Sequence, residues 1–167
     1  TGHRINRYVW RSSVAGYQSM KRWLPRVTVA TIVEKNGRFL MVEEDVHGQL
    51  KINQPAGHLE PGETLPQAAV RETREETAWQ VEVDYLVEFS QWTSASGNHY
   101  LRACFAGRAI QLIPDQVLDD GILRAVWLTR EEVAERQELL RSPLVLHHID
   151  HYINGKKTPL DIFSYYD

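Results

Sequence analysis

The sequence has very little cysteine and no long apolar run. Its only cysteine, Cys104, cannot form an intramolecular disulfide, which is typical of a protein in a reducing compartment. Basic residues are not in excess, and the formal net charge of −3 gives no electrostatic footprint for nucleic acid. No apolar stretch reaches the roughly 20 residues that cross a membrane, and no signal-peptide core or internal repeat is present. We therefore expect a cytoplasmic protein without nucleic-acid or membrane partners.

The length and apolar content predict one compact domain. The chain has 167 residues, of which 43% are hydrophobic, and a domain of this size buries about 70% of the surface of its unfolded chain. Residues 1–19 contain arginines and serines but no acidic group, a composition also found in transit peptides. Because Met20 resembles a natural start just before the first strand, we expect 1–19 to be an upstream or expression-derived extension and 20–167 to be a single domain.

The central part of the chain predicts a loop followed by a helix. Gly57 and the pair Pro61-Gly62 are typical of a loop in which the backbone comes close to other groups. Thr64 and Gln67 have the spacing of a capping box, and Pro66 falls in the first turn, where a missing N–H costs little. We therefore expect a helix to begin directly after Thr64.

The helix carries several acidic side chains on one surface. Glu72, Glu75 and Glu76 are at i, i+3 and i+4, so their carboxylates share one side of the helix. Carboxylates this close repel one another unless a cation lies among them, and hard oxygen ligands favour Mg²⁺, with Mn²⁺ as a substitute. Arg71 adds a guanidinium that can orient a carboxylate through two hydrogen bonds.

A run of Glu and Arg is more often a solvated helix face, so the surrounding pattern matters. The spacing to compare is Gly-x5-Glu-x7-Arg-Glu-U-x-Glu-Glu-x-Gly-U, where U is apolar. The chain matches one Gly, four Glu and one Arg of this pattern, and these six would coincide by chance with a probability on the order of 10⁻⁵. This spacing resembles the motif of the Nudix hydrolase family. The sequence departs from it at Thr73, where an apolar residue is usual, and at Ala78, where Gly normally ends the helix. The matching positions are Gly57, Glu63, Arg71, Glu72, Glu75 and Glu76, with Trp79 in the last apolar place.

The resemblance implies a fold, a cofactor and roles for the motif residues. The fold is an α/β/α sandwich with a mixed central sheet, and Mg²⁺ is bound by Glu72, Glu75 and Glu76. The Gly57 carbonyl completes the metal shell. Arg71 orients the carboxylates, and Glu63 supports them or Arg71. A water polarised by the metal then attacks phosphorus in the substrate, with Glu76, Glu75 or an aspartate as the base.

Further segments resemble the bacterial NudJ phosphatase branch of the family, which implies a substrate class. They are residues 53–60, 91–92, 101–102 and 141–145. This branch hydrolyses nucleoside di- and triphosphates and hydroxymethylpyrimidine diphosphate, releasing phosphate. Alternatives are a diphosphatase of nucleotide sugars, a Nudix-fold isomerase, which would need a catalytic cysteine beside the motif, and a non-catalytic nucleotide-binding module. The sequence leaves open whether the protein is a monomer or a homodimer.

The rest of the chain predicts a layered arrangement of strands and helices. Residues 26–33 are apolar on both faces, as in a central strand, and Asn36-Gly37 predicts a tight hairpin. We expect a loop over 43–50 and a short segment at 52–54. The predicted strands 81–92 and 100–108 surround a turn at 94–98, and another strand spans 122–128.

Two helices are expected near the end of the chain. Thr129 and Glu132 predict a capping box for a helix that ends near residue 137. Ser142 with Pro143 predicts the beginning of a longer helix that Gly155 ends. That helix carries an apolar stripe formed by Val145, Leu146, Ile149, Tyr152 and Ile153.

Several side chains outside the motif are candidate substrate contacts. Arg102 can bind a phosphate or form a structural ion pair, and Trp92 can stack on a ring, whereas Trp127 fits a core position. Arg141 resembles a motif residue that reaches phosphate. Asp119 or Asp120 can supply a metal ligand or a base. His147, His148 and His151 lack a Cys, an acidic residue at matching spacing or an HExxH pattern, so the sequence does not favour a zinc site.

Overall fold

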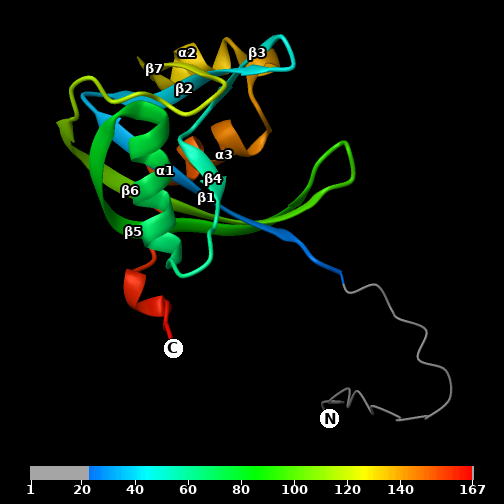
Figure 1. Ribbon diagram of the computed structural model, residues 1–167, viewed down its shortest axis with the longest axis vertical. Helices are drawn as coiled ribbons and strands as arrows, with labels where there is room; N and C mark the ends of the chain where they lie inside the picture. Colours follow the sequence, from blue (N-terminus) through cyan, green and yellow to red (C-terminus); the bar gives the residue numbers. More distant parts are fainter. Residues whose placement is uncertain (1–22, 167) are drawn as a thin grey trace, which may run out of the picture.

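A computed structural model describes residues 23–166, drawn in colour in Figure 1. The predicted extension over 1–19 lies outside the described residues. Strand order is β3-β2-β1-β6-β5, with β4 pairing with β1 and β7 pairing with β2. The pairing of β1 with β6 is parallel and the other pairings are antiparallel, so the predicted mixed sheet is confirmed. The strands are β1 (Arg26–Lys35), β2 (Arg38–Val46), β3 (Gln49–Asn53), β4 (Ala56–His58), β5 (Trp79–Thr93), β6 (His99–Leu112) and β7 (Ile122–Leu128).

Strand β1 has the central position that its sequence predicts. Its consecutive residues Val29 and Ala30 are both fully buried although they point to opposite faces of the sheet. The hairpin to β2 turns at Asn36 and Gly37, which have φ angles of 55° and 75°. Positive φ at both central residues is the geometry of the tight hairpin turn that an Asn-Gly pair favours.

The prediction of a loop over residues 43–50 is wrong. Strand β2 continues to Val46 and pairs with β3 in a second hairpin. The turn is formed by His47 and Gly48, again with positive φ angles of 54° and 79°. The segment was predicted as a loop because its side chains are mostly polar. Glu43, for example, lies in β2 and its carboxylate accepts a hydrogen bond from Arg124 of β7 at 2.7 Å.

The helices begin largely where their sequences predict, with two corrections. The second helix is shorter than expected, because α2 ends at Ala134 and a separate 3₁₀ turn follows. The predicted Ser142 cap is wrong: Pro143 is the N-cap residue of α3, and the buried Ser142 hydroxyl has no partner among the described residues. The helical elements are α1 (Leu65–Thr77), α2 (Arg130–Ala134), η1 (Gln137–Leu139), α3 (Leu144–Ile153) and η2 (Leu160–Ile162). None of the helices in residues 23–166 is long and apolar enough to cross a membrane.

Helices cover both faces of the sheet, which confirms the sandwich (Figure 1). On one face, Ala68 and Ala69 of α1 pack against Phe105 of β6. On the other face, Val145 and Ile149 of α3 pack in a core that contains residues of β1, β2, β5 and β6. Ile153 was expected in the stripe of α3 but is 53% exposed, because it lies in the last turn, beyond the edge of this core.

Candidate active site

Helix α1 is fixed at both ends and along one side. The Thr64 hydroxyl accepts a hydrogen bond from the Gln67 amide, and the Gln67 side chain accepts one from the Thr64 amide. In the middle, Thr73 is fully buried and its hydroxyl donates to the Ala69 carbonyl at 2.7 Å, which satisfies the polar group that replaces the usual apolar side chain. The helix ends at Ala78 with a φ of 60°, in the left-handed region.

The loop before the helix brings its backbone against the acidic surface. Gly57 lies in β4, where it pairs with Val29 of β1. A Cβ atom at position 57 would overlap the carboxylate of Glu72. A side chain at position 57 would therefore displace the Glu72 carboxylate, which is hydrogen-bonded to Arg71. The constraint on this position is that close approach and not its backbone angles.

Arg71 holds the carboxylates in place. Its Nε and Nη2 donate to the two carboxylate oxygens of Glu63 at 3.0 and 2.7 Å, a two-bonded pairing. Its Nη1 donates to Glu72 at 2.9 Å and to Glu75 at 3.0 Å. A further bond runs from Nη2 to the His58 carbonyl at 3.0 Å, so Arg71 also ties the loop to the helix. The hydrogen bond from Arg71 lowers the pKa of Glu63, which keeps that carboxylate ionised.

A third acidic residue from another part of the chain joins Glu72 and Glu75. One oxygen each from Glu72, Glu75 and Asp119 lie within 4.8 Å of one another. The Asp119 amide donates to the Glu75 carbonyl at 3.1 Å, which holds this loop against the helix. Burial raises the pKa of Glu72 above its ordinary value, although the hydrogen bond from Arg71 opposes the shift. Asp120 is exposed and belongs neither to this group nor to the pocket described below.

Glu76 is partly buried and contacts the backbone at the beginning of β4. Its Oε2 accepts a hydrogen bond from the Ala56 amide at 2.8 Å, which joins the end of α1 to the beginning of β4. Burial raises the pKa of Glu76 to about 8, with smaller contributions from the negative charges of Glu72 and Glu44. Without a cation, this carboxyl group is therefore largely protonated at neutral pH.

The donor set fits a hard divalent cation. Among the converging carboxylates Glu72 has a raised pKa, and a cation lying among them would stabilise its charged form. Oxygen ligands of this kind suit Mg²⁺ or Mn²⁺ better than softer ions. Glu72, Glu75 and Asp119 would hold such an ion, whereas Glu76 faces the Ala56 amide.

A pocket of about 300 Å³ includes the backbone of Gly57 in its wall and collects three of the predicted substrate contacts, Trp92, Arg102 and Arg141. Arg102 is partly buried, and burial lowers its pKa. The ion pairs among residues 23–166 do not include Arg102, and its Nε donates only to the Thr28 hydroxyl, at 3.4 Å. A partly buried guanidinium that has no carboxylate partner among residues 23–166 is able to receive an anionic group.

Trp92 forms one side of this pocket together with Tyr100, which was not among the predicted substrate contacts. Its ring stacks on Tyr100, with 5.3 Å between centroids and an interplanar angle of 29°. The two residues are register partners in the β5–β6 hairpin. The sequence could have predicted this contact, because a hairpin that turns at residues 94–98 pairs position 92 with position 100.

Other pocket residues had no signal in the sequence. Glu44 and Asn53 each have one buried oxygen without a hydrogen-bond partner among the described residues, and both line the pocket. Arg141 lies 3.7 Å from Glu44 and is held at the pocket by a backbone hydrogen bond to Ile52. Glu44 was missed because it falls in the segment expected to be a loop.

Trp127 is half-buried and packs edge-to-face on Trp79, as a core position predicts.

The comparisons with known proteins agree with this geometry. The NUDIX domain family matches residues 23–148. Phosphatase NudJ of Escherichia coli (strain K12) is 40% identical over 140 residues, which cover 84% of this chain and 91% of that protein. The same figures hold for phosphatase NudJ of Shigella flexneri. A solved NUDIX hydrolase from Nitrosomonas europaea superimposes with a TM-score of 0.84 at 46% identity, covering 86% of this chain and 98% of that one. This chain therefore belongs to the Nudix hydrolase family, whose members use divalent metal ions to act on small phosphorylated substrates.

Proposed function

We propose that the protein is a Mg²⁺-dependent phosphatase of nucleoside di- and triphosphates and of small pyrophosphates such as hydroxymethylpyrimidine diphosphate. The observation that carries the proposal is the pocket of about 300 Å³ that joins the Gly57 loop to Arg102 and to the Trp92–Tyr100 stack. Such a volume is at the small end for ligand pockets and favours a compact ring with a short phosphate chain. The similarity to phosphatase NudJ supports the release of inorganic phosphate.

Each group of residues has a distinct task in this proposal. The acidic cluster of Glu72, Glu75 and Asp119 holds the cation, with Mn²⁺ as a substitute for Mg²⁺ and with the Gly57 carbonyl as a further ligand. The bound cation neutralises phosphate charge and makes a water more acidic. Arg71 fixes the geometry of the carboxylates, and Glu63 fixes Arg71.

The pocket residues bind the substrate. Arg102 and Arg141 contact its phosphate oxygens, and Trp92 stacks on its ring. The proton of the attacking water goes to one of the carboxylates at this site, Glu75, Glu76 or Asp119. Each of the three is replaced by its amide, and kcat is measured against pH at saturating metal. The base is the group whose replacement removes the acidic limb of the pH profile.

The experiment that tests the proposal is a phosphate-release assay. Nucleoside di- and triphosphates, hydroxymethylpyrimidine diphosphate and a nucleotide sugar are compared with Mg²⁺, with Mn²⁺ and without metal. We expect metal-dependent release of phosphate from the first two classes, and its loss in Glu75→Gln and Glu76→Gln. Near-normal turnover by both variants would overturn the proposal. Cleavage of the nucleotide sugar into two organic phosphates would instead support the alternative diphosphatase.

The substrate contacts are tested separately with two arginines of the same strand. Arg102→Gln removes the guanidinium that lines the pocket, so we expect kcat/KM to fall about 100-fold or more, as for the loss of a charge-assisted contact. Arg108→Gln is the matched control, because Arg108 is exposed and its ion pairs within residues 23–166 are with Glu82 and Asp84 on the surface. Equal kcat/KM values in the two variants would exclude Arg102 from the binding site.

The remaining alternatives lack support. A Nudix-fold isomerase would need a reactive cysteine, but Cys104 is fully buried and burial raises the pKa of its thiol. A non-catalytic module has no use for the full set of carboxylates that this chain keeps. The predicted cytoplasmic location and the choice between monomer and homodimer stay predictions.

A further inference from the structure

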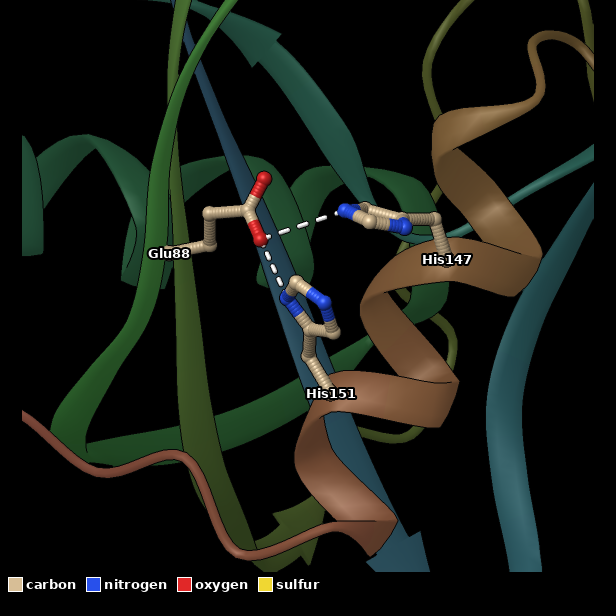
Figure 2. A group of neighbouring side chains, drawn as sticks. All are labelled: Glu88, His147 and His151. Carbon is tan, nitrogen blue, oxygen red and sulfur yellow. Dashed lines mark ion pairs between the residues drawn. The ribbon is translucent and has the colours of Figure 1, made fainter.

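Two histidines of α3 and a glutamate of β5 point at one another on the face of the sheet that α3 covers (Figure 2). The Nε2 atom of His147 lies 3.3 Å from Oε2 of Glu88, and Nδ1 of His151 approaches the same oxygen. The three potential ligand atoms lie within 4.8 Å of one another. The histidine pair drew attention in the sequence, but no acidic residue stood at a matching spacing. The fold supplies that residue.

Two local features create this convergence. The histidines are at i and i+4 of α3, so their rings lie one above the other, with 4.0 Å between centroids. Strand β5 has a register shift between Leu86 and Glu88, which places Glu88 opposite Cys104 of β6. Cys104 belongs to the core under α3, so the bulge turns Glu88 toward α3, where regular alternation would direct it to the other face.

Glu88, His147 and His151 are accessible to solvent. No other charged side chain among residues 23–166 pairs with Glu88. The exposed fractions of the side chains are 15% for Glu88, 24% for His151 and 48% for His147. Within residues 23–166, the ion pairs of Glu88 are made with these histidines alone, and no lysine or arginine is among its partners. Glu88 Oε2 can accept a hydrogen bond from each imidazole only when both facing nitrogens carry protons, whereas a metal ion would bind all three groups with those nitrogens unprotonated.

We propose that Glu88, His147 and His151 form a second metal site, separate from the acidic cluster beside α1, for Zn²⁺ or a similar divalent transition metal. Two imidazoles and one carboxylate are a donor set that zinc accepts, whereas Mg²⁺ favours oxygen ligands alone. The partly exposed edge at His147 leaves a fourth position for water. Because the ligands come from β5 and α3, the ion joins the helix to the sheet and stabilises the folded chain.

Zinc binding to the full chain tests the site. Zn²⁺ is titrated calorimetrically in the presence of saturating Mg²⁺, which occupies the oxygen-rich site. We expect one zinc per chain, an affinity at least about 100-fold lower in His151→Ala and in Glu88→Gln, and unchanged binding in the control His47→Asn. His47 lies in the exposed turn between β2 and β3, and asparagine tolerates its positive φ. Circular dichroism checks that each variant is folded.

Two further measurements distinguish a specific zinc site from adventitious zinc binding. Zinc at a hundredfold excess over its Kd should raise the Tm of the wild-type protein by about 5–10 °C and leave the Tm of His151→Ala unchanged. Anomalous scattering from crystals soaked in zinc should show an ion between β5 and α3, about 2.0–2.2 Å from the three ligands. Equal zinc affinity in the wild type and both variants, or an anomalous peak only beside α1, would overturn the proposal.

Discussion

The carboxyl group of Glu72 occupies the space where a side chain of residue 57 would lie. A Cβ at position 57 would overlap the carboxyl group of Glu72. In Gly57→Ala we therefore expect a loss of about 1–3 kcal/mol in the free energy of unfolding, because overpacking displaces the buried carboxylate. Hydrolysis should fall about 100-fold as the carboxylate moves from its place. Urea unfolding and steady-state kinetics measure the two effects.

The cause of the Gly57→Ala effect can be isolated with a double variant. In Gly57→Ala combined with Glu72→Ala, the overlapping group is gone, so stability should recover by about 0.5–3 kcal/mol relative to the sum of the single changes. Activity should not recover, since a carboxylate of the cluster is missing. Additive losses of stability would show that the two positions do not interact.

Arg71 and Arg74 are neighbours on α1 with very different surroundings, and they make a matched pair. Arg71 is 19% exposed and binds three carboxylates, whereas Arg74 is 45% exposed and lies 3.5 Å from Glu75. Lysine cannot reproduce the fork of bonds to Glu63, so we expect Arg71→Lys to lower kcat about 100-fold and Arg74→Lys to change it less than about twofold. Similar kcat values in both variants would contradict a special role for Arg71.

Because the pKa of Glu76 is raised, we expect the metal-free protein to lose stability as the pH rises. Its pKa is about 8 in the folded chain against an ordinary value of 4.5. Between these values the native state holds a proton that the unfolded chain has released, so the free energy of unfolding falls with increasing pH. We expect the loss to reach a few kcal/mol at most between about pH 5 and pH 8.5.

Metal and mutation should both reduce this pH dependence. Mg²⁺ favours the charged carboxylate, so saturating Mg²⁺ should flatten the pH profile of Tm. Glu76→Gln cannot ionise and can still accept the bond from the Ala56 amide, so the profile of the metal-free variant should also be flatter. An unchanged profile in this variant would assign the pH dependence to other groups, such as Glu72, whose pKa is also raised.

Ala78 offers a test of stability that is separate from catalysis. It ends α1 with a φ of 60°, a conformation in which a Cβ is unfavourable. We expect Ala78→Gly to raise the free energy of unfolding by about 0.5–1 kcal/mol. In contrast, Ala69→Gly, in the middle of α1, should lower it by at least about 0.5–1 kcal/mol, because glycine disfavours a helix interior. Thermal denaturation of the two variants checks the opposite signs.

Part of the site could be read from the sequence because it depends on neighbours within a few residues. The capping box of Thr64 and Gln67 sets the beginning of α1, and the spacing of Glu72 and Glu75 places them on one side of a helix. The central position of β1 and its hairpin at Asn36 follow from local patterns as well.

The sequence alone therefore determined the family motif, the layered fold and the helix that carries the acidic side chains. Only the tertiary structure brought Asp119 to Glu75 and placed Arg102 and Trp92 in one pocket. It also turned Glu88 toward α3. The physical reason is that these contacts join residues far apart in the chain. They depend on strand register, bulges and loop paths, and a shift of one residue in a strand turns its side chains to the other face.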